Sequence, residues 1–115
     1  MATHEQVWVK VNTQVDAAIA DIVSLLNRID GLQTLQSCQG DKGRQGAYIY
    51  FSFGDWRNLC QFAFDQLGPR LREKVGEDAR LSLEVVDGLP PIGKISFSAQ
   101  AIPYITSTLT EVVAV

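Results

Sequence analysis

The sequence predicts an α+β fold whose elements follow the order βαββαββα. Five short segments alternate between apolar and other side chains, as half-buried strands do. Two longer segments between them repeat apolar residues at the i, i+3, i+4 spacing of an amphipathic helix. With 115 residues, 46% of them hydrophobic, the chain is expected to form a single α+β domain over residues 1–115.

The first strand is expected over residues 6–12, where three valines alternate with Trp8 and Lys10. A helix should follow from about residue 13 to residue 29, because Asn12 and Thr13 offer capping side chains. Its apolar residues at helical spacing are Val15, Ile19, Ile22, Val23, Leu26 and Ile29.

Residues 32–38 and 47–53 are the next two strands, and the glycine-rich segment 39–46 joins them. In the second of these strands, Tyr48 and Tyr50 face away from the side chains of Ile49, Phe51 and Phe53.

Asp55 can cap a second helix, and Gly68-Pro69 should interrupt it. The expected apolar stripe of this helix is Trp56, Leu59, Cys60, Ala63, Phe64, Leu67 and Leu71. Strands are expected over residues 81–86 and 94–99. The tail after Pro103 fits a last helix, although its threonines and valines also suit a strand; proline at a helix start favours the helix.

This order contains a split β-α-β unit, which predicts a ferredoxin-like sandwich. The sheet would be mostly antiparallel and five-stranded, with both long helices on one face.

Charge and composition exclude several classes of function. The formal net charge is -3, so non-specific binding to nucleic acid or to anionic membranes is not expected. Two cysteines without a flanking framework fit neither a disulfide-rich domain nor a zinc site. No signal segment or membrane span is recognisable, and we expect a cytoplasmic protein without a metal or cofactor.

The first candidate site is the loop 39–46 with the two residues before it. Three glycines can expose backbone amides to a small anionic ligand, and two cations can neutralise its charge. The predicted ligand-binding residues are Ser37, Cys38, Gly40, Lys42 and Arg44. The same cations would favour the Cys38 thiolate as a nucleophile, but the only histidine, His4, lies in the N-terminal segment. The alternative is that Cys38 is a structural thiol and the loop a plain connection.

Thr34, Ser37, Cys38 and Gly40 form a T-x-x-S-C-x-G segment, preceded by the asparagine-containing turn 27–31. This segment resembles that of the third-step enzyme family of wybutosine tRNA modification, and small uncharacterised bacterial proteins show a similar S-C-x-G strand end. The resemblance implies methyl transfer and tRNA binding, with a functional loop at these residues. Asp41 stands where that family has an arginine, and its later histidine-bearing segment has no counterpart here.

The second candidate site is an aromatic patch on the helix-free face of the sheet, formed by Trp8, Tyr48 and Tyr50. The preferred interpretation is an interface between two copies of the chain. The alternatives are coverage by the chain's own C-terminal segment and stacking of single-stranded nucleic acid. Phe62 is a further interface candidate.

These observations favour a non-catalytic binding or regulatory module that acts as a homodimer and binds a protein partner or a small anionic ligand. The alternative is a thiol-dependent or nucleotide- or tRNA-modifying enzyme that uses Cys38 and the loop 39–46.

Overall fold

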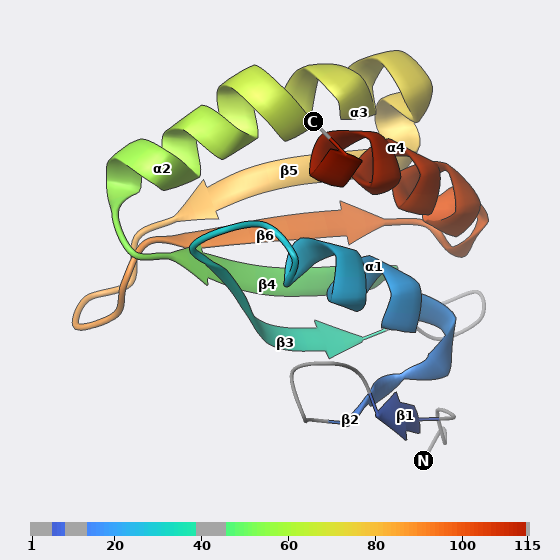
Figure 1. The fold of residues 1–115 in the computed structure, drawn as a ribbon, viewed down its shortest axis with the longest axis horizontal. Coiled ribbons are helices and arrows are strands. Elements are labelled where there is room, and N and C mark those ends of the chain that lie inside the picture. The colour runs from blue at the N-terminus through green and yellow to red at the C-terminus, as the bar shows by residue number, and fades with distance from the viewer. Residues whose placement is uncertain (1–5, 9–13, 39–45, 115) are drawn as a thin grey trace.

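The computed structural model describes residues 6–8, 14–38 and 46–114, and the side chains from residue 17 onward within these ranges (Figure 1). In chain order the elements are β1 (Gln6–Trp8), β2 (Gln14–Asp16), α1 (Ala20–Leu26), β3 (Leu32–Cys38), β4 (Ala47–Phe53), α2 (Trp56–Gln61), a π-helical turn (Phe62–Leu67), α3 (Gly68–Lys74), β5 (Ala79–Glu84), β6 (Ile92–Phe97) and α4 (Ile102–Ala114).

Strands β3 to β6 form one antiparallel sheet with the spatial order β3-β4-β6-β5. Strands β4 and β5 run parallel, because each is antiparallel to β6, which lies between them. The long helix α2–α3 links β4 to β5 and therefore makes a split β-α-β unit. All the helices lie on one face of the sheet, with α1 and α4 side by side (Figure 1). The expected α+β class is thereby confirmed.

The first strand differs from the prediction. Strand β1 pairs with β2 in a separate two-stranded sheet, and the main sheet of the described residues has four strands. The central position next to β4, which a ferredoxin-like order would give to the first strand, belongs to β6. The five-stranded ferredoxin-like topology is therefore not confirmed. The predicted helix start near residue 13 is also wrong, since residues 14–16 form β2 and α1 begins at Ala20.

The core lies between the sheet and the helices. Strand β4 contributes Ile49, Phe51 and Phe53 to it, all of them buried. The Phe51 ring lies over Gly93 of the neighbouring strand, and a Cβ placed on Gly93 would be 2.4 Å from that ring. Glycine at this position therefore makes room for the largest side chain at the centre of the core.

The helix α2–α3 is continuous through its π turn. The Asp55 side chain caps it by accepting a hydrogen bond from the Asn58 amide at 2.7 Å. The Gly68 amide donates to the Ala63 carbonyl, five residues back, and a Cβ on Gly68 would lie 2.3 Å from that oxygen. Gly68-Pro69 therefore ends a π turn without interrupting the helix.

This turn changes which side chains face the sheet. The buried residues are Leu59, Phe62, Ala63, Leu67 and Leu71. Residues spaced by four drift around an α-helix, and the wider π turn brings the later ones back over the sheet. As a result Leu67 and Leu71 stay buried. Phe64 is 64% exposed and Trp56 is 41% exposed, so neither belongs to the buried stripe, whereas Phe62 is buried and is not an interface residue.

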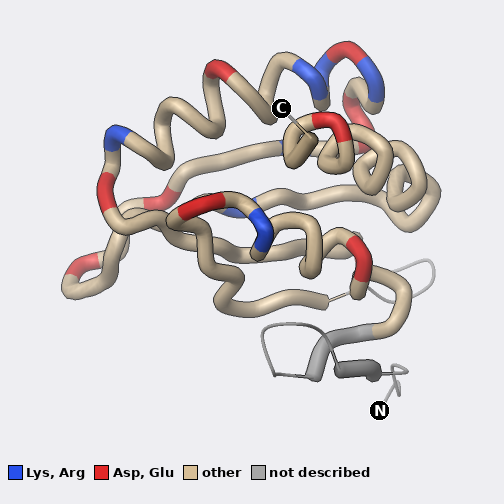
Figure 2. Tube along the Cα trace, in the orientation of Figure 1, with Lys and Arg blue, Asp and Glu red and all other residues tan. Residues whose placement is uncertain are grey.

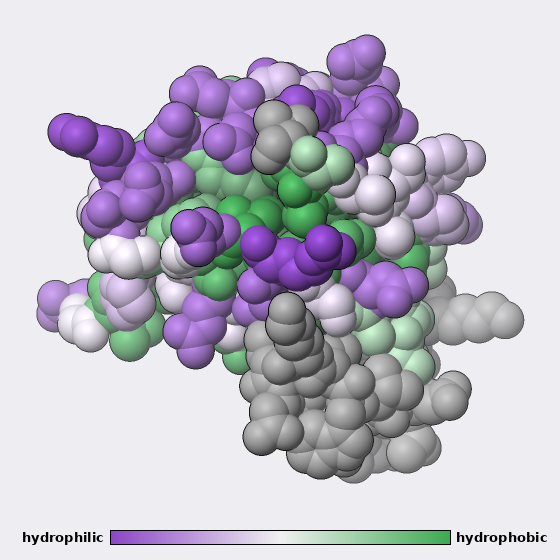
Figure 3. Space-filling view, in the orientation of Figure 1, coloured by the Kyte–Doolittle hydropathy of each residue, from purple (hydrophilic) through white to green (hydrophobic). Residues whose placement is uncertain are grey.

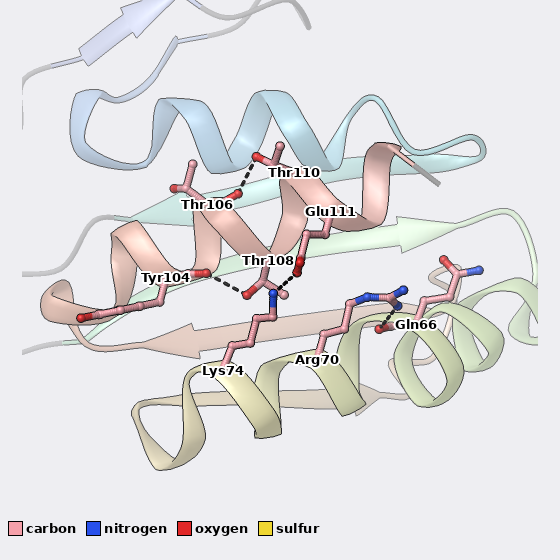
Figure 4. A network of polar contacts seen from close by, with 8 residues as sticks. All are labelled: Gln66, Arg70, Lys74, Tyr104, Thr106, Thr108, Thr110 and Glu111. Carbon is pink, nitrogen blue, oxygen red and sulfur yellow. Dashed lines mark hydrogen bonds and ion pairs between the residues drawn. The ribbon is translucent and has the colours of Figure 1, made fainter.

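The C-terminal segment is a helix, as predicted from Pro103. Its β-branched residues are accommodated because threonine hydroxyls donate to carbonyls four residues back, among them Thr108 to Tyr104 at 2.8 Å (Figure 4). An ion pair between Lys74 and Glu111 joins α3 to α4 at the surface (Figure 4). None of the helices in the described parts of the chain has both the length and the apolar character needed to cross a membrane.

Candidate functional site

The helix-free face of the main sheet carries the candidate site. Residues directly opposite each other in an antiparallel sheet point to the same face, so the strand register gives its composition in three rows. The rows are Cys38, Tyr48, Ser96 and Arg80; Gln36, Tyr50, Lys94 and Ser82; and Gln33, Ser52, Ile92 and Glu84. We call these residues the tyrosine face.

At its centre a lysine lies against two tyrosine rings. The rings of Tyr48 and Tyr50 meet edge to face, with centroids 5.6 Å apart and an interplanar angle of 71°. The Lys94 Nζ atom lies 5.6 Å from the centroid of Tyr48 and 5.2 Å from that of Tyr50. Gln36 Nε2 donates a weak hydrogen bond of 3.4 Å to the Tyr48 hydroxyl. These contacts hold both rings in one arrangement, although each ring is only half-buried.

The charges of the sheet are concentrated on this face. Charged residues lie mainly on helices and loops (Figure 2), and those of strands β3 to β6 are Arg80, Glu84 and Lys94. All three belong to the tyrosine face. Within the described ranges, neither Arg80 nor Glu84 has an ion-pair partner. A planar group can stack on the rings, and Lys94 and Arg80 can neutralise an anion beside it.

The predicted aromatic patch is brought together only in part. Tyr48 and Tyr50 are neighbours on the helix-free face, as expected. The backbone of Trp8 belongs to the separate β1–β2 hairpin, and its side chain lies outside the described part of the structure. The C-terminal segment does not cover the patch, because α4 lies on the helical face with Ile105 and Leu109 buried in the core.

The predicted loop site is described only at its start. Ser37 pairs with Ile49 and points to the helical face, whereas Cys38 pairs with Tyr48 and belongs to the tyrosine face. Gly40, Lys42 and Arg44 lie outside the described residues, as do Lys10 and His4. In the described ranges, no group of histidines, cysteines and carboxylates could hold a metal ion.

Thr34, the first residue of the T-x-x-S-C-x-G segment, has a structural role. Asn27 Nδ2 donates to the Thr34 hydroxyl at 2.8 Å and to the Val23 carbonyl at 2.9 Å. The Thr34 amide donates to Asn27 Oδ1 at 3.1 Å. This pair of residues fastens the end of α1 to β3.

Sequence reasoning missed Lys94 and Gln36, because their places beside the tyrosines depend on which strands pair with β4.

It also missed a shallow depression on the helical face, of about 620 Å³, between the α1–β3 turn and α2. Figure 3 shows hydrophobic residues in the middle of this face with hydrophilic residues around them. The depression is lined by Ile29, Asp30, Gly31, Phe53, Asn58, Gln61, Phe62 and Gln66.

No protein-family model, curated protein or solved structure matches the chain. The resemblance to the wybutosine family therefore stays a prediction.

Proposed function

We propose that the protein is a non-catalytic binding module, acting as a homodimer, whose tyrosine face binds a small anionic ligand that contains a planar ring. The observation that carries this proposal is Lys94, whose ammonium group lies within 6 Å of both tyrosine centroids on a face without helices. A ring stacked on Tyr48 or Tyr50 would place an attached anion close to this charge.

The shape of the face supports a small ligand. Tyr48 and Tyr50 lie on β4, Lys94 lies on the adjacent strand and Arg80 on the edge strand beyond it. Neighbouring strands are about 4.8 Å apart, so a ring over β4 and an anion over β6 or β5 are separated by one or two strand spacings. This separation matches the distance between the base and the phosphate of a nucleotide, which makes a nucleoside monophosphate a suitable probe.

The test is a titration followed by NMR amide shifts, with adenosine monophosphate as the probe. Adenosine and inorganic phosphate serve as matched controls, since each carries one half of the probe. We expect shifts at residues 48, 50 and 94 with the monophosphate, and binding at least about tenfold weaker with either control. Phosphate binding as tightly as the monophosphate, or no shift on this face up to about 10 mM probe, would contradict the proposal.

Two variants make the test specific. Lys94→Gln should weaken monophosphate binding about tenfold and leave adenosine binding unchanged, because only the anion loses its partner. Tyr104→Ser, at an exposed position on the opposite face, is the control and should bind like the wild type. Equal weakening in both variants would place the ligand elsewhere.

A second candidate function is thiol chemistry at Cys38. It is favoured by the position of this half-buried residue at the end of β3, beside Tyr48 and next to the loop 39–45. Alkylation of the folded protein at neutral pH tests it, with Cys38→Ser as the control. A Cys38 that reacts faster than cysteine in solution would support the thiol-dependent enzyme, whereas slower reaction would contradict this second candidate function.

The expected cytoplasmic location stays a prediction.

A further inference from the structure

The two edges of the main sheet are protected to different degrees. At the β3 edge, the strand carries an irregularity between Thr34 and Gln36, and β2 contacts it. At the other edge, β5 pairs with β6 in an unbroken register from Ala79 to Glu84. In the described ranges no strand pairs with the outer side of β5. An unbulged edge strand is a template for pairing with another chain.

The hydrogen bonds at the start of β5 show which of its backbone groups point outward. The Ser98 amide donates to the Asp78 carbonyl at 3.0 Å, so residue 78 is bonded toward β6. Because backbone groups alternate in direction along an antiparallel strand, residues 80, 82 and 84 also bond toward β6. The amides and carbonyls of Ala79, Leu81 and Leu83 therefore point away from the sheet.

The side chains of β5 are self-complementary about Ser82. When two copies of β5 pair antiparallel with the two-fold axis at this residue, Arg80 lies opposite the partner's Glu84 on the helix-free face. On the helical face, Leu81 lies opposite the partner's Leu83, and their backbones exchange both hydrogen bonds. Shifting the register by one residue would put tyrosine-face side chains opposite helical-face ones, and shifting it by two would put Ser82 opposite Arg80 or Glu84. Only the register about Ser82 therefore pairs the opposite charges.

A groove beside this edge, lined mainly by apolar residues together with Arg72 and Arg80, provides further contact. It has a volume of about 260 Å³ and lies between the long helix and β5. Its walls include Ala63, Phe64 and Leu71 on the helix and Leu81 and Leu83 on the strand. Phe64 is the most exposed aromatic side chain of the long helix, at 64%. The partner's leucines and Phe64 would cover this groove.

We infer that two copies of the chain associate through β5, edge to edge and antiparallel about Ser82, and join their sheets into one. The inference rests on the homodimer of the proposed function. In this dimer Arg80 pairs with Glu84 of the other copy, and Lys94 is the cation left for the ligand. Both tyrosine faces lie on the same side of the joined sheet and stay open. This geometry differs from the face-to-face interface expected from the sequence, in which Tyr48 and Tyr50 would be buried.

Charge exchange at residues 80 and 84 tests the inference, with the dimer dissociation constant measured by analytical ultracentrifugation. In a dimer of Arg80→Glu, the new glutamate of each copy faces Glu84 of the other copy. In a dimer of Glu84→Arg, the new arginine of each copy faces Arg80 of the other copy. We expect each single variant to dimerise at least about tenfold more weakly than the wild type. The double variant Arg80→Glu/Glu84→Arg restores opposite charges at every position and should recover the wild-type dissociation constant.

Mixing the two single variants provides a sharper version of the experiment. In the proposed register, the acidic variant faces the basic one with every pair matched, so the mixture should form a dimer that neither variant forms alone. Circular dichroism of each variant checks that the fold is retained. The inference would be overturned if the wild type stays monomeric up to about 1 mM, or if neither single change alters the dimer dissociation constant.

Tyr50→Arg distinguishes this interface from the face-to-face one. If it dissociates the dimer while the charge exchange does not, the tyrosine face is the interface and the β5 pairing is wrong. In that case the ligand titration is carried out on the wild type below its dimer dissociation constant, because Tyr50→Arg removes one ring of the proposed site, and it still decides the proposed function separately.

Discussion

The two faces of strand β4 are built from alternate residues of one seven-residue segment and differ in burial. On the helical face, Ile49 and Phe51 have no exposed surface. On the other face, Tyr48 and Tyr50 are half-buried and contact Lys94 and Gln36. The comparison shows that the strand period separates the residues of the core from those left at the surface.

The largest expected loss of stability comes from truncating a buried side chain of this strand, compared with truncating its neighbour on the other face. Phe51→Ala should lower the free energy of unfolding by about 3 to 5 kcal/mol, because it empties the centre of the core. Tyr50→Ala, its neighbour on the opposite face, should cost about 1 kcal/mol. Urea unfolding followed by circular dichroism measures both losses. Similar losses in the free energy of unfolding for the two variants would contradict the difference between the faces, since they would mean that both faces belong to the core.

Gly93→Ala should destabilise the protein by about 1 to 3 kcal/mol, because the new methyl group collides with the Phe51 ring. Combining it with Phe51→Leu tests the cause. A smaller side chain at 51 leaves room for the methyl group, so the double variant should lose less than the sum of the single losses. Additive losses in urea unfolding would show that contact with the ring is not the reason.

The fold was predictable where one segment determines its own structure. The strands at 32–38 and 47–53, the Asp55 cap and the C-terminal helix follow from local pattern and agree with the structure. The pairing of strands was not predictable, because the position of β6 between β4 and β5 depends on contacts distant in sequence. Residues 14–16 show the limit, since Val15 fits the helical stripe of α1 as well as a strand.

The candidate site was predictable to the same degree. The alternation of β4 places Tyr48 and Tyr50 on a common face whatever the neighbouring strands are. Lys94 and Gln36 are neighbours only because of the β4–β6 and β3–β4 registers, and the β3 irregularity decides that Gln36 lies opposite Tyr50. The π turn likewise decides that Leu67 and Leu71, each four residues after the previous buried residue, both stay on the buried side of the helix, which an α-helical pattern could not indicate.

Asn27→Ala tests how much the contact between α1 and β3 contributes to stability. It removes three hydrogen bonds, two of which join the end of α1 to Thr34 of β3, and we expect a loss of about 1 to 2 kcal/mol in the free energy of unfolding. Thr34→Val is the matched change, because it removes one of these bonds and leaves the backbone amide bonded to Asn27. Its loss should be smaller. A Thr34→Val loss as large as that of Asn27→Ala would contradict this description.

The smallest effect is expected at the surface of the helical layer. Lys74→Met removes the ion pair with Glu111, whose side chains are 36% and 48% exposed. We expect a loss of about 0.5 kcal/mol or less, because solvent screens the pair. A double-mutant cycle with Glu111→Gln, measured by urea unfolding in low salt and in 1 M NaCl, isolates the interaction. A coupling that is large or independent of salt would contradict this expectation.

The central claim is that the tyrosine face is a binding surface and contributes little to the core. The most direct measurement compares Tyr50→Ala with the wild type in two ways, by adenosine monophosphate titration and by urea unfolding. We predict at least about tenfold weaker binding together with a loss of only about 1 kcal/mol in stability. Unchanged binding, or a stability loss comparable to that of Phe51→Ala, would contradict the claim.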